Sequence, residues 1–221
     1  MVKKTALQVD YYTDILCIWA WIAQRRLDEL EQHWDQQIEV HHHFVNLFGD
    51  TAVRIGERWS AKGGFAGFGQ HVLESAEPYD MAPVSADVWS RVRPKTSANA
   101  HLVLKAARLA ASEEDAESLT LAFRKAFFVD ALDIGRLPVL YELAESAGHD
   151  VKAIRMSIRD GSAIAALASD YQRAHTEGIV GSPSWVMDGG RQKLYGNVGY
   201  RVLNANVEGL LTKRADDASW C

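Results

Sequence analysis

Both ends of the chain carry the hydrophobic pattern of β-strands. Residues 6–13 read Ala-Leu-Gln-Val-Asp-Tyr-Tyr-Thr, with partial alternation of apolar and polar positions and several β-favouring side chains. Residues 38–45 form a second strand-like run. Between these runs, residues 19–34 show helical spacing of their apolar positions, which are Ile22, Ala23, Leu27 and Leu30. A strand, a helix and a strand in this order predict a βαβ unit with parallel strands and a right-handed crossover.

The pattern changes in the middle of the chain. From residue 50 to residue 177 the apolar positions follow the helical period, and one expected buried face consists of Leu102, Val103, Ala106, Leu109 and Ala110. After residue 178 two short strand-like runs, 184–187 and 192–195, flank an Asp-Gly-Gly turn and predict a hairpin, and residues 200–213 predict a last helix. We therefore expect an α/β protein whose first domain, residues 1–49 and 178–221, is interrupted by an all-helical insertion domain, residues 50–177.

Composition and charge limit the kinds of partner that the protein can bind. Of its 221 residues 48% are hydrophobic and 10% aromatic, which is typical of a packed globular protein. A net charge of -5 without a long Lys/Arg run argues against nucleic acid or an anionic membrane as the main partner. Charged Asp10 comes too early for a secretory signal, and no run approaches the ~18 apolar residues of a membrane span. We expect a cytoplasmic protein, and an uncovered apolar helical face would favour a homodimer.

The two cysteines, Cys17 and Cys221, are too few for a disulfide framework, and a reducing compartment keeps both as thiols. Cys17 lies where the first strand gives way to the first helix. A thiol at a helix N-terminus is exposed to unpaired N–H groups and to the positive end of the helix dipole, so we expect its pKa to lie below the free value of about 8.5. The alternative is a buried, unreactive cysteine that packs as a small hydrophobe.

The order βαβ, helical block, ββα, with Cys17 at the first helix and Pro183 before the third strand, resembles the thioredoxin fold. Segments 13–21, 44–47, 133–144, 178–186 and 195–197 extend the resemblance to the disulfide-oxidoreductase A (DsbA) family, with its FrnE-type, 2-hydroxychromene-2-carboxylate isomerase and kappa-class glutathione transferase relatives. The resemblance implies a cis Ser182–Pro183 bond that faces Cys17. It also implies a substrate or glutathione site that includes Trp19, Asn46, Ser182, Pro183 and Asn197. For Asn197, a role as a turn residue after Gly196 remains an alternative.

One departure from these relatives matters for the chemistry. Ala20 occupies the position of the second, resolving cysteine, so a mixed disulfide on Cys17 must be resolved by an outside thiol such as glutathione. The isomerase and kappa branches carry Ser at the Cys17 position. The leading expectation is a thiol–disulfide oxidoreductase with catalytic Cys17, glutathione as co-substrate and no tightly bound cofactor. A glutathione-dependent isomerase or transferase and a non-catalytic thiol- or peptide-binding protein remain alternatives. Cys221 is either a second resolving thiol or an uninvolved chain end.

Four further features have simpler interpretations. Successive strand residues face opposite sides, so at most two of His41, His42 and His43 can converge, and we expect strand surface and no metal site. The glycine-rich run 63–69 lacks the ending of a phosphate loop and predicts a flexible loop that enters a helix near the site. Asp14 is expected to cap the first helix. Trp19 and Trp21 cannot share a helix face, and we assign Trp19 to the site and the other to the core.

Overall fold

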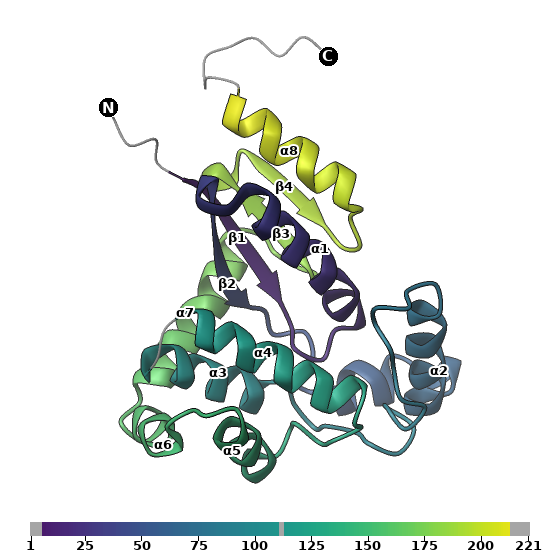
Figure 1. Cartoon of the computed structure of the whole chain (residues 1–221). Helices are drawn as coiled ribbons and strands as arrows, with labels where there is room; N and C mark the ends of the chain where they lie inside the picture. Colours follow the sequence, from purple (N-terminus) through teal and green to yellow (C-terminus); the bar gives the residue numbers. More distant parts are fainter. Residues whose placement is uncertain (1–5, 111–112, 213–221) are drawn as a thin grey trace.

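The computed structural model describes residues 6–110 and 113–212, so the question of Cys221 lies outside the described residues. One sheet has the strand order β2-β1-β3-β4 (Figure 1). Its strands are β1 (Leu7–Thr13), β2 (Ile38–Phe44), β3 (Ser184–Met187) and β4 (Gln192–Tyr195). β1 pairs parallel with β2 and antiparallel with β3, and β3 and β4 form the antiparallel hairpin. The βαβ unit and the hairpin predicted from the hydrophobic pattern are both confirmed.

Helices cover both faces of the sheet. α1 (Ile18–Trp34) and α8 (Tyr200–Thr212) pack side by side on one face (Figure 1), and α7 (Ser162–Thr176) packs against β2. Successive strand residues point to opposite faces. Val9 and Tyr11 therefore join the core beneath α1 and α8, whereas Tyr12 packs with Ala174 of α7. Because both faces are covered, every residue of β1 except Gln8 is buried.

The helical insertion lies between β2 and β3. It contains the short turns Ala52–Glu57 and Ser60–Lys62, then α2 (Gly64–Ala76), α3 (Ala98–Ala110), α4 (Glu113–Phe128), α5 (Leu137–Ser146), α6 (Val151–Arg159) and α7. α3 contacts each of α4, α5, α6 and α7 and so forms the centre of this group. The largest core cluster joins Leu16 and Phe44, at the ends of the sheet, to Phe123 and Phe127 of α4. The insertion and the sheet thus share one core, which holds the end of β1 in a fixed place.

Two parts of the helical expectation are wrong. Residues 77–97 are turns with an isolated bridge between Val88 and Val92, because three prolines in this stretch lack the N–H that a helix interior needs. Leu109 is 53% exposed and Ala110 is also exposed, so the last turn of α3 does not continue the buried face. Within the described residues, no helix combines the length and apolar character that crossing a bilayer requires.

The glycine-rich run is not a flexible loop. α2 begins at Gly64 and includes most of the run. A Cβ atom on Gly67 would stand 1.7 Å from the carbonyl oxygen of Lys62, and one on Gly69 would stand 3.0 Å from that of Val88. These glycines therefore permit close backbone contacts around a rigid helix, and the prediction of flexibility is corrected.

Candidate active site

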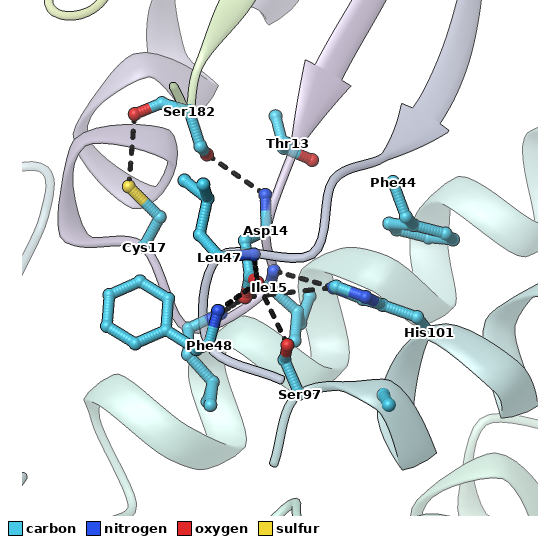
Figure 2. A network of polar contacts seen from close by, with 12 residues as sticks. Thr13, Asp14, Ile15, Cys17, Phe44, Leu47, Phe48, Ser97, His101 and Ser182 are labelled. Carbon is cyan, nitrogen blue, oxygen red and sulfur yellow. Dashed lines mark hydrogen bonds and ion pairs between the residues drawn. The ribbon is translucent and has the colours of Figure 1, made fainter. Parts of the chain in front are cut away.

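Cys17 is the N-cap residue of α1. Its backbone is extended, its N–H donates to the carbonyl of Asp14 at 3.0 Å, and its own carbonyl accepts from the N–H groups of Ala20 and Trp21, both at 3.1 Å. The thiol Sγ donates to the carbonyl oxygen of Ser182 at 3.2 Å (Figure 2). Two segments separated by 165 positions in the sequence thus meet at the sulfur. The residue is only 6% exposed, but it lines a cavity.

The Ser182 segment is tied to the turn that carries Cys17. The Ser182–Pro183 peptide bond is cis, and β3 begins at the next residue. The hydroxyl of Ser182 accepts a hydrogen bond from the N–H of Asp14 at 2.9 Å (Figure 2). Two hydrogen bonds, one to the thiol and one to the backbone, therefore fix the distance between the Ser182 backbone and Cys17.

The cavity at Cys17 has a volume of about 370 Å³. Its apolar wall includes Trp19, which is half-buried, so this side chain lies where the sequence placed it. An adjoining hollow of about 460 Å³ shares several wall residues with the cavity and is also lined by Asn46. The combined space suits a molecule longer than a single amino acid. Trp21, by contrast, is buried in the core and donates its indole N–H to the carbonyl of Pro83 at 3.1 Å.

Basic side chains that were not predicted from the sequence line the cavity. Arg54 and Arg58 border both the cavity and the adjoining hollow, and His71 of α2 borders the cavity. The guanidinium of Arg54 lies 4.7 Å above the ring of Phe48, which restricts its orientation. A guanidinium pairs well with a carboxylate, so this end of the site favours an acidic ligand. The four-residue spacing of the two arginines in a helical turn was the available signal.

The expected low pKa of Cys17 is wrong. Burial raises the pKa of this thiol, and the charge of Asp14 raises it further. Hydrogen bonds from Ser182 and from the backbone N–H groups of Ala20 and Trp19 favour the thiolate, but they do not offset burial. At neutral pH the sulfur is therefore mainly a thiol, in agreement with its donation to the Ser182 carbonyl.

Asp14 does not cap α1 as expected. Its carboxylate is fully buried, and Oδ1 accepts a hydrogen bond from the N–H of Leu16 at 3.0 Å. Oδ2 accepts three hydrogen bonds (Figure 2). They come from the N–H groups of Leu47 and Phe48, at 3.0 and 2.9 Å, and from the hydroxyl of Ser97 at 2.9 Å. These donors follow three different elements, so the carboxylate joins the turn after β1 to the segment after β2 and the start of α3. It thereby positions Leu47 and Phe48, which form part of the cavity wall.

A buried histidine supports the same turn. His101 of α3 accepts from the N–H of Ile15 with Nε2 at 3.1 Å, and its Nδ1 lies 3.1 Å from the hydroxyl of Tyr171. Burial lowers the pKa of His101, so the ring is neutral, with the proton on Nδ1 and directed to Tyr171. The ring also stacks on Phe44 at 4.4 Å (Figure 2). One backbone donor of the turn after β1, the N–H of Ile15, is thus satisfied by a side chain from the insertion.

The histidine tract is not strand surface. His42 and His43 are 8% and 9% exposed, because helices cover both faces of β2. Nε2 of His43 lies 2.9 Å from Asp10, and Nδ1 lies 3.1 Å from Asp170, which also pairs with Lys105 at 2.9 Å. Burial opposes the charge of His43, but the two carboxylates raise its pKa above the usual value. Through these contacts with Asp10 and Asp170, His43 links β1, β2 and α7.

Asn197 is not among the described residues that line the cavity or the adjoining hollow. Its amide donates to the hydroxyl of Tyr79 at 2.8 Å, and its carbonyl oxygen accepts from Arg26. Arg26 belongs to α1, and Tyr79 follows α2. The structure thus brings Cys17, Trp19, Ser182 and, in the hollow, Asn46 together. Asn197 instead links α1 to the segment after α2.

A cysteine at the start of α1 and a cis proline segment beside it form the centre of the site, and a comparison of the sequence with protein families identifies the fold that carries them. The family model of the DSBA-like thioredoxin domain matches residues 8–208. The chain belongs to this family. No curated protein shows significant sequence similarity to the chain. The strand order and the helical insertion described above are therefore those of a DsbA-like thioredoxin fold.

Solved structures share this DsbA-like fold. A probable DsbA oxidoreductase from Streptomyces coelicolor superposes with a TM-score of 0.74 and 21% identity, over 97% of this chain and 94% of the other. The cytosolic disulfide reductase DsbM from Pseudomonas aeruginosa gives 0.69 and 20%, over 93% and 98%, and its complex with GSH also matches. A 2-hydroxychromene-2-carboxylate isomerase gives 0.66 and 19%, over 96% and 100%. At these identities the likeness shows the fold alone.

Proposed function

We propose that this protein is a cytoplasmic thiol–disulfide oxidoreductase that works with the single active-site cysteine Cys17 and with glutathione as co-substrate. The observation that carries the proposal is the sulfur of Cys17 in a cavity, opposite the carbonyl of Ser182 and next to two arginines. The description of DsbM as a cytosolic disulfide reductase, and its complex with GSH, support the same class of substrate for this fold. No tightly bound cofactor is required.

The chemistry consists of three exchange steps. The thiolate of Cys17 attacks one sulfur of the substrate disulfide, a mixed disulfide forms, and the other sulfur leaves as a thiolate that takes a proton from water. Ala20 offers no second thiol, so the thiolate of glutathione attacks the substrate sulfur of the mixed disulfide, which releases Cys17 and leaves a disulfide between glutathione and the substrate. A second glutathione reduces this disulfide, which gives the second substrate thiol and oxidised glutathione. The N–H groups of Ala20 and Trp19 stabilise the sulfur anion. Because burial raises the pKa of Cys17, the thiolate fraction is small in the free protein, and the first step limits the rate.

The walls of the cavity suit glutathione. Its two carboxylates would pair with Arg54 and Arg58, Asn46 would contact the part that extends into the adjoining hollow, and the backbone of Ser182 would pair with the cysteinyl unit. We expect Arg58→Ala to raise the KM for glutathione by about tenfold, the loss of one charge-assisted bond of about 1.5 kcal/mol, with little change in kcat. Arg91→Ala, an exposed cation outside the cavity, is the control and leaves KM unchanged.

The direct test is the reduction of 2-hydroxyethyl disulfide by glutathione. The rate is measured by coupling the oxidised glutathione that forms to glutathione reductase. We expect turnover by the parent protein and by Cys221→Ser, and no turnover by Cys17→Ser, because a hydroxyl cannot form the mixed disulfide. Mass spectrometry of the parent protein treated with oxidised glutathione should show one glutathione on Cys17. Undiminished turnover by Cys17→Ser would refute the proposal.

A glutathione-dependent isomerase or transferase is a second candidate, and one observation favours it. Cys17 is held as a thiol that donates a hydrogen bond, which is the role that a Ser hydroxyl would have at this position. In such an enzyme Cys17 would donate to the sulfur of bound glutathione, and glutathione would be the nucleophile. Cys17→Ser would then keep both glutathione binding and activity. Binding of glutathione without either activity would instead indicate a thiol-binding protein.

A further inference from the structure

Three metal-ligating side chains converge outside the Cys17 cavity. Glu31 comes from α1, His42 from β2 and Glu117 from α4, and one potential ligand atom of each lies within 4.8 Å of the other two. None of the three lines the cavity at Cys17. The cluster is therefore a separate feature, formed where the sheet, its first helix and the insertion meet.

His42 is the buried member of the cluster. It is 8% exposed, and among the described residues no group meets its Nε2 atom with hydrogen-bond geometry, although the carboxylate of Glu117 contacts this atom. The ring is held by Tyr11, which stands edge-on at 5.6 Å, and by Arg108, which donates to the His42 carbonyl at 2.6 Å. An imidazole nitrogen is a metal ligand in its neutral form.

The two carboxylates come from two different helices. Glu31 lies on α1 and Glu117 on α4, and one carboxylate oxygen of each lies within 4.8 Å of the other and of an imidazole nitrogen of His42. Two ionised carboxylates at this distance repel each other, and a divalent cation between them would remove this repulsion.

We propose that Glu31, His42 and Glu117 bind a divalent transition metal ion of the zinc class. One imidazole nitrogen and two carboxylate oxygens are a donor set that zinc accepts, and three protein ligands leave a fourth position for water. Ligand atoms about 2.1 Å from a tetrahedral zinc ion lie about 3.4 Å apart. Ligand atoms that stand up to 4.8 Å apart must therefore approach by as much as about 1.4 Å, and the contact between His42 and Glu117 must open to admit the ion. Glu31 and Glu117 are only half-buried, and rotation of their side chains can supply these movements. The bound ion would link α1, β2 and α4.

The test uses untagged protein in which Cys17→Ser and Cys221→Ser remove the two thiols, since thiolates bind zinc on their own. Zinc is titrated in competition with a chromophoric chelator. We expect one equivalent to bind with a Kd in the micromolar range or below, and Glu31→Gln to weaken binding at least about tenfold, as the loss of even a supporting residue does. Glu29→Gln, exposed on the same helix, is the matched control and binds zinc like the parent.

Two further measurements complete the test. Glu117→Gln, a variant of the same size, must weaken zinc binding as Glu31→Gln does, and circular dichroism must show that both proteins are folded. Zinc should raise the Tm of the parent and of Glu29→Gln but not that of the two ligand variants. Equal zinc affinity in the parent, Glu31→Gln and Glu117→Gln would overturn the proposal, and so would the lack of saturable zinc binding by the parent.

Discussion

Replacing Asp14 by Asn tests whether one buried carboxylate holds the turn between β1 and α1. Oδ2 accepts from three donors and Oδ1 from the N–H of Leu16. An Asn side chain has one acceptor oxygen, so its best orientation keeps three bonds and turns its NH₂ group toward the N–H of Leu16. That clash costs about 1–3 kcal/mol, and loss of charge assistance costs about 1 kcal/mol for each of the three remaining bonds. We expect the free energy of unfolding to fall by about 4–6 kcal/mol.

Urea denaturation at neutral pH, followed by tryptophan fluorescence and circular dichroism, measures this loss. The control is Asp188→Asn, which removes an exposed carboxylate paired with Arg191 at 2.7 Å and should cost less than about 1 kcal/mol. The variant should also show a lower pKa for Cys17, because the charge of Asp14 raises that pKa. A loss of stability no larger than that of the control would refute the role assigned to the carboxylate.

Three further changes test the fold and the site. The pKa of His43 in the folded protein lies above its usual value of about 6.5. The stability that its ion pairs contribute is therefore complete below about pH 6.5 and is lost as the pH rises through the folded-state pKa. Denaturation at several pH values should show that the difference in stability between the parent and His43→Gln becomes smaller as the pH rises through that value. Gly67→Ala should lower stability by 2 kcal/mol or more, on the order of an overpacking penalty, whereas Gly209→Ala, with open space around its Cβ position on α8, should raise it by roughly 0.5–1 kcal/mol. Alkylation of Cys17 in Cys221→Ser protein should have its midpoint above the free-thiol value of about 8.5, and a midpoint below it would contradict the argument from burial.

Local patterns were sufficient for most of the fold. The strands, the first and last helices and the hairpin lie within one or two residues of the ranges expected from hydrophobic period and turn residues, because these signals act between near neighbours in the chain. The predictions that were wrong also came from local patterns, but in these cases the structure depends on which distant residues pack against the segment. A glycine-rich run is typical of a flexible loop, but the carbonyl of Lys62 lies close against Gly67. Leu109 continues an apolar stripe, but it is 53% exposed.

By itself the sequence determined that Cys17 begins a helix, that Pro183 precedes a strand, and, through the family resemblance, that the two meet. The tertiary structure alone decided the chemistry around them. Solvent exclusion reversed the expected pKa shift of the thiol, Asp14 became an anchor for donors from distant segments, and His42 was placed between carboxylates of two helices. Burial and ion pairing depend on which remote parts of the chain surround a group, and no periodicity within a single element records that information.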